Sequence, residues 1–142
     1  MDYYSTKEQK NLMDYVGKTL IGKIDSWYES WLEIFQSEEE PKYTNEIKAR
    51  DLYQRLSEED KKMILSIIKE ASYRIVYSIL RESQESLDPS PDALYLSARK
   101  DNIVYPNIAT ESDGLCGEMV LDDGWYEMFS RYFEMDDRLW WK

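Results

Sequence analysis

Histidine is absent from this 142-residue chain, and cysteine occurs once, at Cys116. Without imidazole, the chain lacks the side chain that most often moves protons near neutral pH and a common ligand of zinc. A single cysteine cannot close an intramolecular disulfide, so we expect a reducing, cytoplasmic environment. No run approaches the roughly 20 apolar residues that cross a bilayer. We therefore expect no membrane association.

Glycine and proline are also scarce, with five and four residues, whereas hydrophobic residues make up 42% of the chain and aromatic residues 14%. This composition is far from that of a disordered chain. The length is typical of one domain. We expect residues 1–142 to form a single domain, with an internal boundary near residues 88–92, where two prolines resist helix formation.

Apolar residues recur at intervals of three or four through residues 6–35, which predicts a long first helix. Trp27 and Trp31 follow this spacing and are expected to fill the core. Gly17 and Gly22 lie inside the same segment. Because glycine is costly in a helix interior, these two positions predict a kink or the close approach of a neighbouring element.

Residues 44–55 are amphipathic and predict a short second helix. Ser57 followed by Asp60 is a helix start signal, because the serine side chain can accept a hydrogen bond from the backbone of the first turn. Residues 63–80 are apolar on most sides, which predicts a buried central helix. The β-branched content of this run leaves a strand over residues 73–80 as an alternative.

The C-terminal third is less regular. Residues 93–108 contain short apolar runs that predict either two brief strands or an ordered loop. A final helix is expected from about Asp123, with one apolar face made by Trp125, Met128, Phe129, Tyr132 and Phe133. The fold class is therefore mostly α, a single-domain bundle of about four helices with an irregular segment between the central and C-terminal helices.

Motifs for known chemistries are missing. Neither Gly114 nor Gly124 can be the turn glycine of a calcium loop, because apolar residues occupy ligand positions in both registers. Cys116 has no histidine to activate it, and no phosphate-binding glycine loop occurs. We expect no enzyme activity and no cofactor. A carboxylate-only magnesium site remains an alternative, with its ligands drawn from Asp113, Glu118, Asp122 and Asp123.

Acidic residues outnumber basic ones by 29 to 18, giving a net charge of −11. Such a chain repels nucleic acid and attracts cationic partners. Residues 111–142 hold nine acids and three bases, a net charge of −6 and about half of the excess. Aromatic side chains beside carboxylates favour a protein-binding surface. The candidate partner-binding residues are Glu118, Asp122, Asp123, Trp125, Tyr126, Glu127, Asp136, Asp137, Trp140 and Trp141.

The sequence thus favours a small acidic, non-enzymatic protein that docks on a basic protein. Immunity proteins and inhibitors that mimic the charge of DNA belong to the same broad class. Two alternatives are an enzyme or small-ligand domain built on carboxylates and tyrosines, and a structural subunit of a homo-oligomer. The sequence does not define the oligomeric state.

Overall fold

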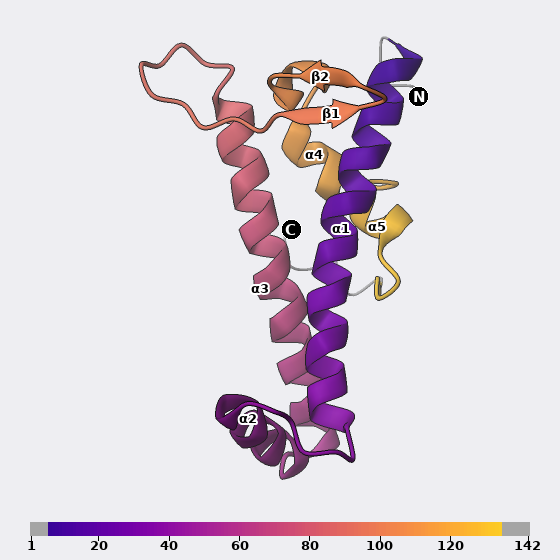
Figure 1. Cartoon of the computed structure of the whole chain (residues 1–142), viewed down its shortest axis with the longest axis vertical. Helices are drawn as coiled ribbons and strands as arrows, with labels where there is room; N and C mark the ends of the chain where they lie inside the picture. Colours follow the sequence, from indigo (N-terminus) through magenta and orange to yellow (C-terminus); the bar gives the residue numbers. More distant parts are fainter. Residues whose placement is uncertain (1–5, 135–142) are drawn as a thin grey trace.

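Two long helices dominate a computed structural model of the chain, which describes residues 6–134 (Figure 1). In chain order the elements are α1 (Lys7–Gln36), α2 (Thr44–Gln54), α3 (Glu58–Glu85), β1 (Ala98–Lys100), β2 (Ile103–Tyr105), the 3-10 turn η1 (Ile108–Glu111), α4 (Leu115–Val120) and α5 (Trp125–Phe129). Helices α1 and α3 lie side by side, with α2 at one end and the β1–β2 hairpin at the other. The mostly helical fold predicted from the sequence is confirmed.

Both long helices begin at side chains that cap them. The Thr6 hydroxyl accepts a hydrogen bond from Gln9 N–H, and the Ser57 hydroxyl accepts one from Asp60 N–H, each at 3.1 Å. These bonds satisfy amide hydrogens that the first helical turn leaves unpaired. Residues 73–80 are helical, so the strand alternative is wrong. The start signal and the length of α3 outweigh its β-branched content.

The irregular segment contains two short antiparallel strands, as the first of its two alternatives predicted. Ala98 pairs with Tyr105, and Lys100 pairs with Ile103. Asp101 and Asn102 form the turn with φ values of 52° and 64°. Asp and Asn tolerate this left-handed backbone and favour two-residue hairpin turns.

The C-terminal helical region differs from the expectation. Helix α4 was not predicted, and α5 ends at Phe129 rather than continuing through Phe133. The reason for the early end is a competing acceptor, since Arg131 N–H donates to Oδ2 of Asp25 in α1 at 2.8 Å. A buried carboxylate therefore takes the amide that another helical turn would use.

One core joins α1, α3, α4 and α5 into a compact domain. Trp125 packs at its centre against Gly17 of α1, where an added Cβ would lie 2.5 Å from the indole ring. The close approach predicted at this glycine is therefore made by a side chain. The largest fully buried side chains are Trp125, Leu12, Met13, Ile21, Leu80, Ile108, Leu115, Met119 and Ser83.

Two expectations about burial are wrong. Trp27 is 66% exposed, because the buried residues of this part of α1, Ile24, Asp25 and Tyr28, point about 60–160° around the helix from it. Helix α3 is not buried all round, since Ile67 and Ile75 are more than half exposed. Within residues 6–134, no helix combines the length and the apolar character that a membrane span requires.

Candidate functional site

A hollow of about 220 Å³ lies where α3 ends and the loop before α4 begins. Its lining comes from the last turn of α3 and from two loops far apart in sequence. The lining residues are Gln84, Glu85, Leu87, Asp88, Ser112, Asp113 and Gly114. Pockets that enclose a whole small molecule hold roughly 300–1,000 Å³. This hollow is therefore smaller than a typical small-molecule pocket.

Every charged residue that lines the hollow is acidic, namely Glu85, Asp88 and Asp113. Glu85 forms an ion pair with Arg81 at 3.3 Å, while Asp88 and Asp113 have no cation within ion-pair distance among the described residues. The last turn of α3 contains no basic residue. Because the C-terminal end of a helix carries partial negative charge, the dipole of α3 adds to the negative charge of these carboxylates.

Hydrogen bonds fix the walls of the hollow. Gln84 Oε1 accepts a hydrogen bond from Cys116 N–H at 2.9 Å, which ties the start of α4 to the end of α3. The Ser112 hydroxyl donates to Glu118 at 2.8 Å and accepts from Gly114 N–H at 3.2 Å. The loop that carries Asp113 is thereby held between two anchored elements.

Cys116, whose backbone N–H donates to the lining residue Gln84, is buried. Burial raises the pKa of the Cys116 thiol, the Arg81 guanidinium opposes this, and the Glu85 carboxylate adds to it. A thiol with a raised pKa is a poor nucleophile at neutral pH. The raised pKa therefore disfavours Cys116 as a nucleophile at neutral pH.

The carboxylates predicted to bind a partner lie elsewhere, at the turn between α4 and α5. Asp122 and Asp123 are exposed, and Asp123 N–H donates to Glu127 Oε2 at 3.0 Å. Glu118 is half-buried, and its carboxylate accepts the bond from Ser112. The structure thus brings these four carboxylates to one short segment.

The aromatic part of that prediction needs a correction. Trp125 and Tyr126 are only 1% and 2% exposed, because α5 turns both rings into the core against α1 and α3. Neither side chain is a surface anchor. The exposed apolar residues of this segment are Leu121 and Met128.

Four further candidates lie outside the described residues. They are Asp136, Asp137, Trp140 and Trp141. Their proposed role in partner binding stays a prediction.

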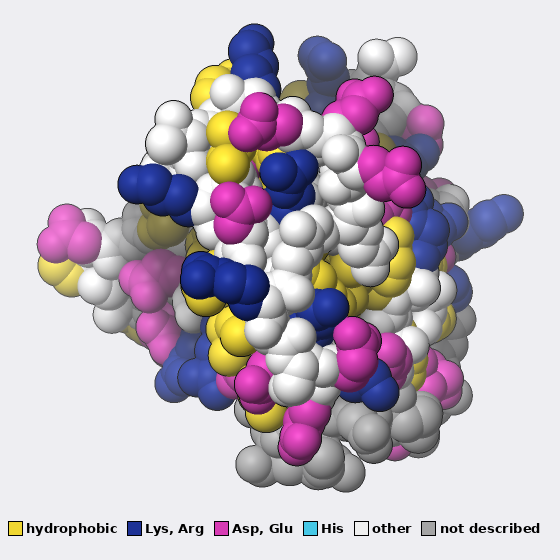
Figure 2. All heavy atoms as spheres, turned by 90° about the horizontal axis from the view of Figure 1, so that it is seen from below, with side chains coloured by type: hydrophobic (Ala, Val, Ile, Leu, Met, Phe, Trp, Pro, Cys, Tyr) yellow, Lys and Arg dark blue, Asp and Glu magenta, His cyan; other side chains and the backbone are white. Residues whose placement is uncertain are grey.

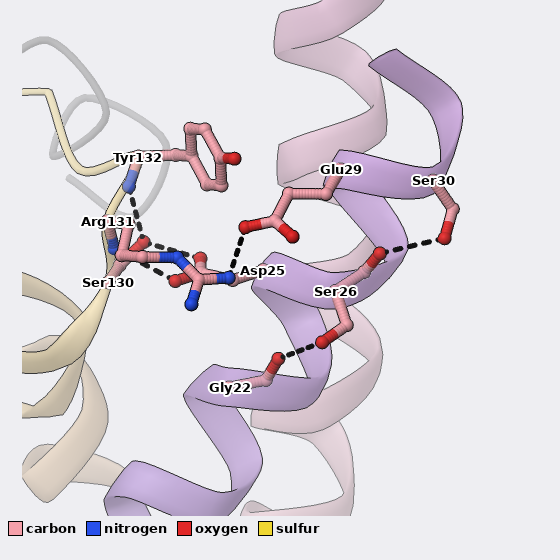
Figure 3. Close-up of polar contacts among 8 residues, drawn as sticks. All are labelled: Gly22, Asp25, Ser26, Glu29, Ser30, Ser130, Arg131 and Tyr132. Carbon is pink, nitrogen blue, oxygen red and sulfur yellow. Dashed lines mark hydrogen bonds and ion pairs between the residues drawn. The ribbon is translucent and has the colours of Figure 1, made fainter. Parts of the chain in front are cut away.

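A second polar cluster joins α1 to the segment after α5 (Figure 3). Asp25 is 3% exposed, and its Oδ1 accepts the Ser130 hydroxyl hydrogen at 2.7 Å. Glu29, one turn further along α1, forms an ion pair with Arg131. Both carboxylates are satisfied by residues 130 and 131. This cluster therefore fixes the chain after α5.

Lys69 of α3 holds the same segment from the other side. It is 7% exposed, and its ammonium group lies 3.5 Å from the Tyr132 carbonyl oxygen and 3.9 Å from Glu134. Tyr132 packs edge-on against Tyr28, with ring centroids 4.7 Å apart. Burial raises the pKa of Tyr132, and the neighbouring Glu29 carboxylate raises it further. The phenol is thus neutral at physiological pH.

The end of the molecule that carries α2 has side chains of both charges. Figure 2 looks onto the end that carries α2, where basic and acidic side chains are interspersed with apolar ones. The carboxylate-lined hollow is at the opposite end of α3. Among residues 6–134, no group of three or more cysteine or carboxylate side chains has the arrangement of a metal site.

Comparisons with known proteins give no match. No protein-family model matches the chain. No curated protein sequence and no solved structure is significantly similar to it. Functional inference therefore rests on the residues and geometry of this chain.

Sequence reasoning missed the hollow, although one signal was present. Glu82, Glu85 and Asp88 follow one another at helical spacing where α3 ends, and acidic residues are unfavourable at that end of a helix dipole. Nothing in the sequence indicated that Asp113, 25 positions beyond Asp88, would line the same hollow as Glu85 and Asp88.

Proposed function

We propose that this protein is a non-enzymatic binding module that docks an acidic surface onto a basic partner protein. The net charge of −11 supports this proposal because it steers a cationic partner toward the molecule. The cytoplasm is the proposed location, supported by the single cysteine. In broad class, such a protein is comparable to immunity proteins and charge-mimicking inhibitors.

The observation that carries the proposal is the hollow at the end of α3. Asp88 and Asp113 line it, are exposed, and have no cation within ion-pair distance in the described part of the chain. A lysine or arginine side chain of a partner would supply the missing positive charge. Arginine fits best, because its planar guanidinium can donate hydrogen bonds to two carboxylates at once.

The turn between α4 and α5 is the second part of the proposed surface. Its exposed carboxylates would favour the approach of a basic partner over a longer range. Leu121, which is 63% exposed, offers apolar contact area beside them. The carboxylates would then attract the partner, and Leu121 would contact it.

The test compares two double variants that change the net charge equally. D88N/D113N neutralises the hollow, whereas D122N/D123N neutralises the turn. Wild type and both variants are immobilised and exposed to lysate of the native host at low and moderate salt. We expect wild type and D122N/D123N to capture one basic protein, and D88N/D113N to lose it.

Other outcomes have equally clear meanings. If D122N/D123N alone loses the captured protein, the turn is the docking site and the hollow is not. If all three forms retain the same material, or none retains any, the acidic surface does not select a partner and the proposed function is wrong. If the wild type does capture a partner selectively, calorimetry with that purified partner measures how binding depends on salt. The dependence must be steep for a charge-driven contact.

A further inference from the structure

Helix α3 carries an apolar stripe on the side that faces away from the core. Its members recur at every fourth position and span about 24 Å at 1.5 Å per residue. They are Met63, Ile67, Ala71, Ile75 and Ile79, and the four large side chains are 60%, 51%, 63% and 43% exposed. An apolar surface this continuous is typical of an interaction site.

The stripe has no role in the monomer core. The residues of α3 that are buried in the domain lie on the opposite side of the helix, namely Lys69, Tyr73, Leu80 and Ser83. At 100° per residue, Ala71 points about 160° away from Lys69 and Tyr73. Two separate faces of one helix are therefore apolar, and the described chain covers only one.

We propose that a second copy of this chain covers the stripe, with the two α3 helices antiparallel and Ala71 on the two-fold axis. Residues at equal distances on either side of Ala71 then lie at the same height. Ile67 meets Ile75 of the other copy, whereas Met63 and Ile79 point about 80° to either side of Ala71 and lie at the edges of the contact. Ala71 faces its own counterpart, and its small side chain lets the helices approach closely at the centre.

The charges beside the stripe are complementary in this arrangement. Glu70 and Arg74 lie on the same flank, and the two-fold axis brings Glu70 of each copy within about 3 Å in height of Arg74 in the other. Near the two ends the charges are mixed, because Asp60 lies close in height to Arg81 of the other copy and level with Glu82. In a parallel pairing each of these residues would instead oppose its own counterpart. Charge thus favours the antiparallel dimer.

The two arginines can replace their ion pairs within the helix by ion pairs with the other copy. Arg74 pairs with Glu70 within the helix at 2.5 Å, and the Arg74 side chain is 71% exposed. Arg81 pairs with Glu85 at 3.3 Å and is 66% exposed. Exposed pairs of this kind contribute little to stability, so their replacement by pairs between copies costs little.

Further exposed apolar residues occur in the elements next to the two ends of α3. Leu52 of α2 is exposed at one end, and Leu94 and Tyr95 are exposed in the loop that follows the other end. Figure 1 shows α2 at the foot of α3 and this loop at its top. An antiparallel dimer brings the α2 end of each copy toward the loop of the other.

A contact built on one helix face remains modest in area, so we expect a weak dimer with roughly micromolar affinity.

Disulfide trapping tests the register of the helices. Ala71→Cys places a thiol on the two-fold axis, where two copies can reach the Cα separation of about 4–7 Å that a disulfide needs. Ser78→Cys is the matched control on the same exposed face, because residue 78 would lie about 21 Å from its counterpart. Wild type, whose Cys116 is buried, gives the background. We expect mild oxidation to cross-link A71C and leave S78C and wild type monomeric under denaturing conditions.

Sedimentation equilibrium tests the face itself. Ile75→Glu would bury charge in the proposed interface, whereas Leu121→Glu alters a side chain of equal 63% exposure elsewhere. Both variants should fold, as circular dichroism would verify. We expect wild type and L121E to dimerise with increasing concentration and I75E to stay monomeric. A monomeric wild type at all concentrations, a dimer unaffected by I75E, or a dimer in which A71C does not cross-link would each overturn the proposal.

Discussion

Ser130 donates its hydroxyl hydrogen to Oδ1 of Asp25 at 2.7 Å and joins two residues that are 105 positions apart in the chain. The second oxygen of Asp25 accepts a hydrogen bond from Arg131 N–H at 2.8 Å. The carboxylate is buried, so both bonds form away from water. Asp25 thereby decides where α5 ends and how the following residues lie against α1.

Replacing Asp25 by Ala should lower the free energy of unfolding by about 2–4 kcal/mol, because hydrogen bonds to a charged group contribute roughly 1.5–3 kcal/mol each and buried donors are left unpaired. Urea denaturation followed by circular dichroism measures this loss. Ser26→Ala is the control, since the exposed Ser26 hydroxyl donates only to the Gly22 carbonyl oxygen one turn back in the helix. Equal stabilities for the two variants would contradict the role given to Asp25.

Gly17→Ala and Gly22→Ala should have opposite effects. A Cβ on residue 17 would lie 2.5 Å from the Trp125 ring, whereas one on residue 22 would meet no atom within 4 Å. We expect G17A to destabilise the protein by about 1–3 kcal/mol through overpacking. We expect G22A to stabilise it by up to about 1 kcal/mol, because alanine favours the helix. Thermal unfolding of both variants would check the pair, and a stable G17A would show that Trp125 does not need this gap.

Asp88→Asn should raise stability by about 0.3–1 kcal/mol, because it removes a negative charge near the negative end of the α3 dipole. Asp92→Asn, four residues further from that end, is the control and should have a smaller effect. Melting temperatures at low ionic strength measure both, and the difference should shrink with added salt. Destabilisation by D88N would mean that Asp88 has a structural role and would weaken its assignment to a binding hollow.

Cys116 should react slowly with thiol reagents in the native state. Burial holds the pKa of the thiol above its usual value, so less thiolate is present at pH 8 than for a free cysteine. The reaction with Ellman's reagent should become fast when urea unfolds the chain. Rapid native labelling would show that the thiol is accessible.

The same pKa shift predicts a pH dependence of stability. A folded-state pKa above the unfolded one favours the protonated native form, so the contribution of Cys116 is complete below about pH 8.5–9 and is lost as the pH rises through the folded-state pKa. The difference in unfolding free energy between wild type and Cys116→Ala should therefore narrow at alkaline pH. Urea titrations at pH 7 and above pH 9 test this, and a constant difference would contradict it.

Local patterns in the sequence predicted the two long helices and the short helix α2, but not α4 or the end of α5. The spacing of apolar residues and the caps at Thr6 and Ser57 act between residues three or four positions apart, so they can be read without knowledge of the fold. The turn at Asp101 and Asn102 was not predicted, although both residue types tolerate its left-handed backbone.

Tertiary structure decided which apolar faces became core. Ile75 and Leu80 belong to the same helix and are both apolar, yet only Leu80 is buried, because the neighbouring elements cover one side of α3. Trp125 is buried and Trp27 exposed for the same reason. Periodicity defines a face, but it does not say what packs against it.

The candidate sites depend on contacts that have no local signal. Asp113 meets the end of α3 because Gln84 anchors the start of α4 across 32 positions. The acidic composition of the C-terminal segment was evident from the sequence, whereas the burial of Tyr126 and the capture of Arg131 by Asp25 required the packed fold. The sequence by itself therefore determined a helical, acidic protein, and tertiary packing decided which of its charged and apolar groups remain available to a partner.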